Sequence, residues 1–233
     1  MYISNVHAEN FRNFSKIDIP LKPFAILVGI NDVGKSNLIE AINILLYNSK
    51  SNYYSKKLSK YDFNSQAVKE FKEILVNLFD ECNGKEGIFD SNKYVEEIYI
   101  NAPKVIVRLR FEGANNDYEK ALLRDWLNGD ENQQYFEIEY IYYLENKKKL
   151  TEIINKMVSD ELIDDNYNNF DLFLECYEYS FKSTNNSKDI NYNKIKNFVS
   201  NCIIAERDSF SSDDNVYSSK IISKIIDNGL SLK

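Results

Sequence analysis

Alternating apolar and polar side chains open the chain and predict two paired β-strands. The alternation runs over residues 2–11 and returns over 16–21, with the two-residue period of strands that bury one face. Arg12 and Asn13 lie between the two runs, where a tight turn is required. The chain is therefore expected to begin with a small antiparallel ribbon.

The pattern changes at residue 24, first to a continuous apolar run and then to a helical period. Residues 24–28 are all apolar and are bounded by Pro23 and Gly29, which predicts a buried strand of a parallel sheet. From Asn37 onward the apolar side chains recur every three or four positions, which predicts a helix with one buried face. That face comprises Leu38, Ile39, Ile42, Leu45 and Leu46.

Both periods recur along the rest of the chain. Further strands are predicted at 105–111, 135–144, 176–181 and 202–205, and further helices at 66–81, 115–127, 147–158, near 170, at 190–199 and at 216–226. The polar segment 49–65 is expected to be an exposed connection without a role in the core, and 84–92 to be a loop.

These elements together predict an α/β fold with a mixed sheet. The first helix is expected to follow the third strand, and strands 105–111 and 135–144 to form a second, antiparallel layer. We find no internal repeat at a fixed period and no linker long enough to separate independent domains.

An octapeptide between the predicted third strand and first helix has the composition of a phosphate-binding loop. Residues 29–36 read Gly-Ile-Asn-Asp-Val-Gly-Lys-Ser, which matches the pattern G-x-x-x-x-G-K-[ST]. Glycines let the backbone N–H groups curl around phosphate oxygens, and the positive end of the following helix dipole adds to the attraction. A glycine turn that matches by chance is the alternative, and the flanking strand and helix patterns argue against it.

The motif assigns separate tasks to its residues. Lys35 is expected to reach the β- and γ-phosphates and is the one catalytic residue indicated, while Ser36 offers its hydroxyl to Mg²⁺. ATP and Mg²⁺ are therefore the expected cofactors. The loop residues expected to contact the nucleotide are Gly29, Asn31, Asp32, Val33, Gly34, Lys35 and Ser36.

Composition narrows the class of protein further. Hydrophobic residues make up 43% of the 233 residues and charged residues 28%, which is ordinary globular usage. No apolar stretch approaches the roughly 20 residues of a membrane span, and the amino terminus does not resemble a signal peptide, so we expect a cytoplasmic protein. The three cysteines form no C-x-x-C pair, and His7 is the only histidine, which excludes a His-rich metal site and a Ser-His-Asp nucleophile system. His7 is expected to be structural.

The net charge of −7 disfavours a protein that holds nucleic acid over its whole surface. The densest basic patches are Lys56, Lys57 and Lys60, and later 147–149. Such runs are usually solvated helix faces, so contact with DNA is expected only through a complete assembly.

Residues 3–14 and 26–42 together resemble the amino-terminal lobe of the RecF/SMC-like ABC ATPases, and most closely the OLD (overcoming lysogenization defect) family. The shared features are an N-F-[RK]-[NS]-F turn, a G-x-N-x-x-G-K-[ST]-N loop and a helix that continues as Leu-Ile-Glu-Ala-Ile. The match is specific over 1–46. The later segment 203–208, Ile-Ile-Ala-Glu-Arg-Asp, more weakly resembles the strand and turn near the end of the first lobe in OLD-type proteins.

The resemblance implies roles for three residues beyond the motif itself. Asn31 would face the terminal phosphate, Asn37 would lie at the nucleotide, and Arg12 would approach the phosphates or the base from the first turn. The alternatives are that Arg12 is a solvated turn residue and that Asn37 belongs only to the first helical turn.

The resemblance also implies a P-loop NTPase fold of the ABC-ATPase head type that is incomplete in this chain. It divides the chain into a nucleotide-binding core over 1–48, a variable insertion over 49–200, and a return strand and helix over 201–233. Partners implied by the family are a second head in a head-to-head homo-oligomer and a Toprim-type nuclease domain or separate effector, often in defence against phage. No Toprim pattern is recognisable in the sequence.

Two family features are missing from the sequence. It contains no L-S-G-G-like signature, and its nearest match to an apolar strand ending in two carboxylates is 74–81, which ends in Asp80 and Glu81 but has helical spacing. Three functions stay open: an ATPase module that couples nucleotide state to dimerisation and an effector, a nucleotide-dependent interaction module without hydrolysis, and a small self-contained NTPase that uses Asp80 and Glu81.

Overall fold

The computed structural model describes residues 1–30, 34–46, 55–83, 91–128, 135–159, 170–183, 190, 195, 196, 198 and 199. The chain divides into two compact units, Met1–Ser200 and Asn201–Lys233, and all described residues belong to the first. The predicted elements at 202–205 and 216–226, and most of the helix predicted at 190–199, lie outside the described residues.

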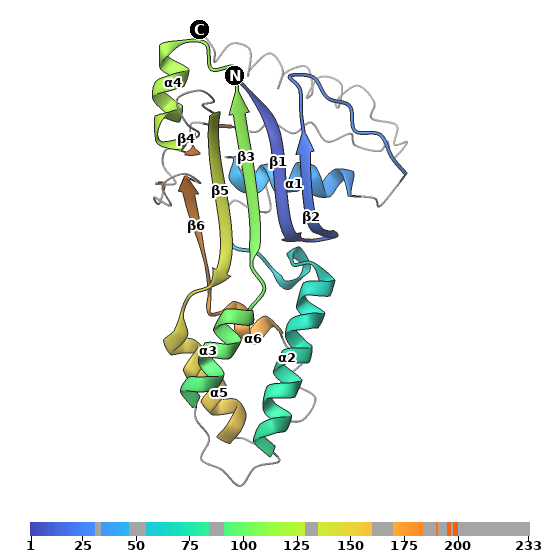
Figure 1. Cartoon of the computed structure of the whole chain (residues 1–233), viewed down its shortest axis with the longest axis vertical. Coiled ribbons are helices and arrows are strands. Elements are labelled where there is room, and N and C mark those ends of the chain that lie inside the picture. Colours follow the sequence, from blue (N-terminus) through green and yellow to red (C-terminus); the bar gives the residue numbers. More distant parts are fainter. Residues whose placement is uncertain are drawn as a thin grey trace, which may run out of the picture. The chain divides into compact units, whose positions relative to one another are not determined.

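One six-stranded antiparallel sheet forms the centre of the first unit (Figure 1). Its strands are β1 (Tyr2–Phe11), β2 (Phe14–Pro20), β3 (Val105–Glu112), β4 (Leu127–Asn128), β5 (Tyr135–Leu144) and β6 (Tyr177–Ser183). The order is β2-β1-β3-β5-β4, and β6 also pairs with β5. The predicted hairpin of β1 and β2 and the predicted strands β3, β5 and β6 are confirmed.

The second antiparallel layer predicted from the sequence is wrong. Val6 of β1 stands opposite Ile19 of β2 on one side and Leu109 of β3 on the other, so β3 and β5 extend the sheet that β1 and β2 begin. Every strand pair among the described residues is antiparallel. The alternation within a strand does not specify which strand pairs with it. The pairing of β3 with β1 makes one sheet where two layers were predicted.

The strand predicted at 24–28 is also wrong. These residues have no regular structure, and the side chains of Phe24, Ile26 and Val28 are 80%, 71% and 90% exposed. A parallel strand requires hydrogen-bonding neighbours as well as apolar side chains. None of the strand pairs in the described part of the chain includes this segment.

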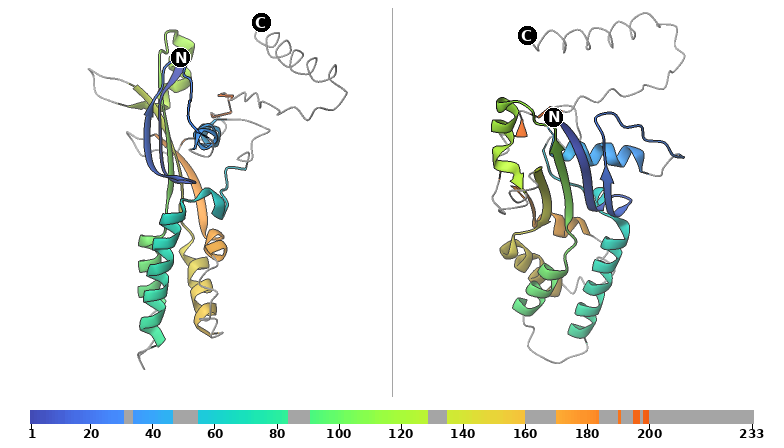
Figure 2. Two further views of the ribbon diagram at one scale, coloured as in Figure 1. Left: turned by 90° about the vertical axis from the view of Figure 1, so that its right-hand side faces the viewer. Right: turned by 45° about the horizontal axis from the view of Figure 1, so that its top comes forward.

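Helix α1 (Lys35–Leu45) lies against one face of the sheet, as the edge-on view in Figure 2 shows. Its buried residues Leu38, Ala41, Ile44 and Leu45 face buried side chains of β1, β3 and β5. The predicted helix is therefore confirmed, although Ile39, assigned to its buried face, is 44% exposed. Burial of this face supplies the hydrophobic free energy that holds α1 to the sheet.

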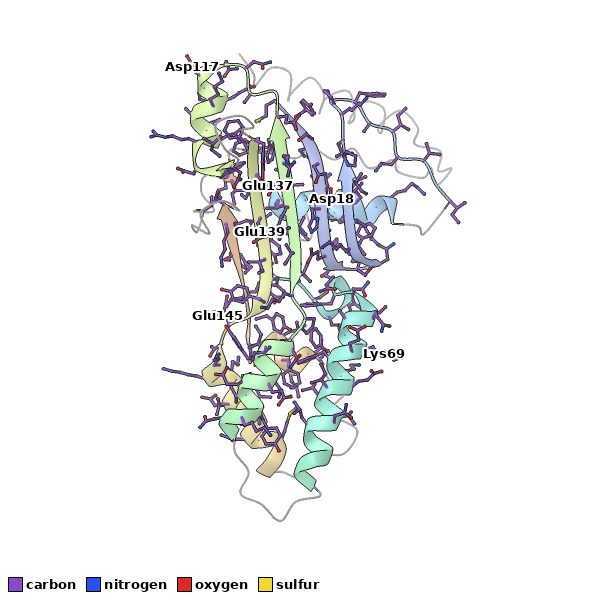
Figure 3. All side chains as sticks on the ribbon, viewed as in Figure 1. Asp18, Lys69, Asp117, Glu137, Glu139 and Glu145 are labelled. Atoms are coloured by element: carbon purple, nitrogen blue, oxygen red, sulfur yellow. The ribbon has the colours of Figure 1, made fainter. Side chains whose placement is uncertain are left out.

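The opposite face of the sheet carries paired charges. Asp18, His7, Arg108 and Glu139 stand side by side on successive strands. The Arg108 Nε donates to Glu139 Oε2 at 2.6 Å, and the His7 ring lies 3.2 Å from Asp18 and 2.8 Å from Glu9. Figure 3 shows Asp18 on β2 and Glu139 on β5 of this face. Because His7 and Arg108 each lie beside a carboxylate, this row of described residues presents no unpaired basic side chain.

Four helices lie at one end of the sheet (Figure 1). They are α2 (Ser65–Asn83), α3 (Ser91–Asn101), α5 (Lys147–Ser159) and α6 (Phe170–Leu174). The predicted helices α2, α5 and α6 are confirmed, and Phe71 and Leu75 of α2 are 1% exposed. Phe71 packs edge to face against Phe170 and Phe173 of α6.

Helix α3 was not predicted from the sequence. It packs on α5, where the Lys147 ammonium donates to Glu96 at 2.7 Å and lies 4.0 Å from the Tyr99 ring centroid. Its buried residues Val95 and Ile98 are too few to give a clear helical period beside the two glycines of 84–92. Packing against α5 thus stabilises a helix that the local sequence pattern does not predict.

The helix predicted at 115–127 is shorter than expected. Helix α4 (Asp117–Leu123) has Asn116 as its N-cap residue. The Asn116 side chain accepts the Glu119 N–H at 2.8 Å, as is usual for an N-cap asparagine. A 3₁₀ turn at Arg124–Trp126 ends it and places the Trp126 side chain, 1% exposed, in the core.

The segment predicted as an exposed connection is partly buried. Within its described part, Leu58 and Phe63 belong to the core, and Lys56 is only 1% exposed. Three other lysines of the two basic patches have acidic neighbours: Lys60 pairs with Asp171, Lys147 with Glu96, and Lys149 lies 2.8 Å from Glu175. The predicted basic patches are therefore largely neutralised. No helix in the described ranges has the length and apolar character needed to cross a bilayer.

Candidate functional site

Three of the predicted phosphate-binding residues, Gly34, Lys35 and Ser36, form the N-terminus of α1. Gly34 is the N-cap residue, with φ +104°, and its carbonyl accepts the N–H of Leu38 at 3.0 Å. Lys35 and Ser36 form the first turn, whose N–H groups have no partners within the helix. Asn31, Asp32 and Val33 lie outside the described residues. A helix N-terminus with these residues is suited to an anion.

Glycine at position 34 is required by both backbone and packing. Its φ lies where side chains are rarely tolerated, and a Cβ there would stand 2.6 Å from Asn13 Nδ2 and 2.8 Å from a ring carbon of Phe14. The turn between β1 and β2 thus rests directly on the start of α1. This contact brings Arg12 and Asn13 to the loop.

The Lys35 ammonium points back into its own loop. It donates to the carbonyl oxygen of Gly29 at 2.8 Å and also to that of Ile30. An ammonium held by these backbone carbonyls can exchange its neutral acceptors for charged phosphate oxygens. Ser36 is exposed, so its hydroxyl is accessible to a ligand.

Arg12 connects the β1–β2 turn to α1 and to the segment before α2. Its backbone is left-handed, with φ +51°, and its side chain donates from Nε to Asp62 Oδ1 at 3.2 Å and from an Nη to Asn37 Oδ1 at 3.0 Å. The Arg12 carbonyl accepts the Asn64 amide at 2.9 Å. Arg12 is therefore a fixed residue and not a freely solvated one.

Asn37 completes the link between α1 and the turn. Its Nδ2 donates to Asn13 Oδ1 at 2.7 Å, while its Oδ1 accepts from Arg12. These side chains line an open hollow of about 500 Å³ beside the helix N-terminus. The lining residues are Arg12, Asn13, Asn37, Tyr61, Asp62, Phe63 and Ser65.

Asp62 was not identified from the sequence, although a signal for it was present. Its Oδ2 accepts the Ser59 N–H at 3.0 Å and the Ser59 hydroxyl at 2.8 Å, which closes a capping box of the pattern Ser-x-x-Asp. Its Oδ1 accepts from Arg12. Asp62 is 8% exposed and so orients Arg12 from within the core.

The segment considered for a self-contained NTPase is part of a helix that leads away from this site. Asp80 and Glu81 belong to α2, which begins at Ser65 beside the hollow and runs away from the sheet (Figure 1). Fifteen residues of α-helix separate Ser65 from Asp80, a length of about 22 Å. The helical interpretation of 74–81 is confirmed, since the segment belongs to α2 and is not a strand.

Comparison with known proteins identifies the family of the chain. A family model described as AAA ATPase domain matches residues 1–229. The endonuclease GajA of Bacillus cereus (strain VD045) is 38% identical over 101 residues, which cover 42% of this chain and 16% of GajA. The DNA replication and repair protein RecF of Clostridium botulinum (strain ATCC 19397 / Type A) is 36% identical over 97 residues, which cover 38% of this chain and 26% of RecF.

A shorter match is found with RecF of Arthrobacter sp. (strain FB24), which is 41% identical over 46 residues, or 19% of this chain and 12% of that protein. The chain thus spans about a quarter or less of the length of each of these relatives. The resemblance to the RecF/SMC-like ATPases and the OLD family that was expected from the sequence is confirmed.

Proposed function

Because the chain belongs to the AAA ATPase domain family, we propose that it binds ATP with Mg²⁺ at the N-terminus of α1. In this proposal Gly29 and the loop after it, Gly34 and Lys35 surround the β- and γ-phosphates. Arg12 and Asn37 lie at the side of the phosphates, where the hollow leaves room for the rest of the nucleotide.

One observation carries the proposal: two segments far apart in sequence meet at a helix N-terminus. Arg12 of the first turn donates to Asn37 two residues after the loop lysine, at 3.0 Å. Two cations, Arg12 and Lys35, together with the positive end of a helix dipole, favour a polyanion in one place. This arrangement also favours a nucleotide role for Arg12 over the role of a solvated turn residue.

The residues present also suit a magnesium ion bound with the nucleotide. Ser36 is exposed in the first turn of α1 and would supply its hydroxyl as one ligand, the remaining ligands being phosphate oxygens and water. When bound, the ion neutralises phosphate charge. Lys35 would hold the phosphates beside it, and Gly34 would let the turn of Arg12 and Asn13 pack against the start of α1.

Competition between nucleotides tests where the affinity arises. A fluorescent ATP analogue is bound to the full chain and displaced with ATP, ADP or AMP, each with Mg²⁺. Since Lys35 and the loop act on the β- and γ-phosphates, AMP should compete at least about tenfold more weakly than ATP. Equal competition by ATP and AMP would assign binding to the base and contradict the proposed site.

The wider role that we propose is an OLD-like ATPase module. In it, nucleotide state controls contact between two heads and the activity of a nuclease or other effector, with DNA reached through the complete assembly. The support is the similarity to an endonuclease and to a DNA replication and repair protein. A Toprim-type nuclease domain and an effector on a separate chain are both compatible with this proposal.

The alternative is a module that binds ATP without hydrolysing it alone. It is favoured by the place of 74–81 in a helix that leads away from the loop and by the lack of an L-S-G-G-like signature in the sequence. ATP would then order a surface for a partner. Steady turnover by the purified chain at low concentration, lost on replacement of Lys35, would decide against this alternative.

A further inference from the structure

A buried lysine closes the C-terminal end of α1, opposite the proposed phosphate site. Lys56 is 1% exposed, and its Nζ donates to the carbonyl oxygens of Asn43, Ile44 and Leu46 at 3.3, 2.6 and 2.9 Å. The last carbonyl groups of a helix lack partners within the helix, and an ammonium group has three donors. The donors of Lys56 therefore match three acceptors at the helix end.

The electrostatics of the helix favour this cation. Burial lowers the pKa of Lys56 to about 8, so the charged form with three donors still predominates at pH 7. Burying an ammonium costs free energy unless it is hydrogen-bonded, and the negative end of the α1 dipole offsets part of that cost. Any displacement of the helix end would break several of these bonds together.

The backbone of Lys56 binds the sheet at the same time. Its carbonyl oxygen accepts the hydroxyl of Tyr140 at 2.7 Å, and Tyr140 is a fully buried residue of β5. Lys56 has φ +61°, a conformation that residues other than glycine seldom adopt. One residue thus joins the end of α1 to a central strand.

We propose that Lys56 is a positioning residue for the phosphate site: by fixing α1 to β5, it sets the affinity of the loop for the nucleotide. This inference rests on the function proposed above. An 11-residue helix is a rigid rod of about 16 Å, so a tilt at one end moves the N–H groups and Lys35 at the other. With the N-terminal end held through Asn37 and Asn13, both ends are fixed before a ligand arrives.

The test compares Lys56→Met and Tyr140→Phe, which each remove one side of the link, with Lys57→Met as the exposed neighbouring control. ATP affinity is measured at a temperature at which circular dichroism shows every variant folded. We expect Lys56→Met to bind ATP about tenfold more weakly, Tyr140→Phe to have a smaller effect, and Lys57→Met to match the unaltered chain. The double variant should bind no more weakly than Lys56→Met, because both changes break one link.

Amide hydrogen exchange of residues 35–46 without nucleotide separates this inference from the proposed function. Faster exchange in Lys56→Met than in Lys57→Met is expected, whether or not ATP binds. Unchanged ATP affinity in folded Lys56→Met would overturn the inference, as would unchanged exchange of α1. If the unaltered chain binds no ATP, the proposed function fails, and the positioning role fails with it. If Lys56→Met does not fold, Tyr140→Phe must show weaker ATP binding and faster exchange for the inference to stand.

Discussion

Replacing Lys35 with alanine should abolish measurable ATP binding while leaving the chain folded. The Lys35 ammonium donates to two loop carbonyls, and a bound phosphate would receive those donors as charge-assisted hydrogen bonds. Two such bonds at roughly 1.5–3 kcal/mol each correspond to at least about 100-fold in affinity. The measurement is a calorimetric titration of Lys35→Ala with Mg-ATP beside the unaltered chain.

The matched control is Lys22→Ala, which removes an exposed lysine from the segment before the loop. It changes the net charge equally, so it shows how much of any loss comes from general electrostatic attraction. Lys35→Ala should unfold in urea within about 0.5 kcal/mol of the unaltered protein, as surface substitutions usually do. Unchanged ATP affinity in this variant would remove Lys35 from the site.

Replacing Gly34 with alanine should lower both stability and ATP affinity. The positive φ costs an alanine about 1–2 kcal/mol. Its Cβ would also lie 2.6 Å from Asn13 Nδ2 and 2.8 Å from Phe14. Overpacking of this kind adds roughly 1–3 kcal/mol. We therefore expect urea unfolding to show a loss of about 2–5 kcal/mol, with the turn displaced from the start of α1.

Gly113→Ala provides a control with similar backbone strain but a different location. Gly113 has φ +70° and lies beyond the end of β3, where a Cβ would meet the Tyr2 ring at 3.3 Å and the Met1 Cα at 3.9 Å. This variant should lose less stability and retain its affinity for ATP. If Gly34→Ala were as stable as the unaltered chain and bound ATP equally well, the close contact between the turn and α1 would not matter for the site.

Local periodicity was sufficient to predict most of the elements. The strand predicted at 135–144 coincides with β5, and the one at 105–111 falls one residue short of β3, because both bury alternate side chains in the core. Helix α2 was equally clear, since Phe71, Leu75 and Leu78 repeat along one buried face. In these segments the side-chain pattern and the final burial have the same cause.

Elements that depend on distant neighbours could not be predicted in this way. The segment 24–28 has the side chains of a buried strand, but no strand in the described part of the chain supplies hydrogen bonds to it. Helix α3 depends on its contact with α5. The single sheet depends on the pairing of β3 with the edge of β1 that lies opposite β2. These pairings are properties of the folded chain as a whole.

The same distinction applies to the site. The motif identified Gly34, Lys35 and Ser36 directly, and the family resemblance suggested Arg12 and Asn37, which the structure places in contact. Their supporting residues were less visible. Asp62 had a local capping signal, the pattern Ser59-x-x-Asp62. The burial of Lys56, by contrast, depends on carbonyl groups that come together only once α1 has formed.

The central claim is that the loop at the start of α1 grips the phosphates of a nucleotide, and backbone amide NMR of the full chain tests it most directly. Titration of the ¹⁵N-labelled 27.3 kDa protein with Mg-ATP should give saturable shifts that are largest at Gly29, Gly34, Lys35 and Ser36, with smaller shifts at Arg12. Saturable shifts confined to another surface, such as the charged sheet face around His7, with the loop amides unchanged, would contradict the account.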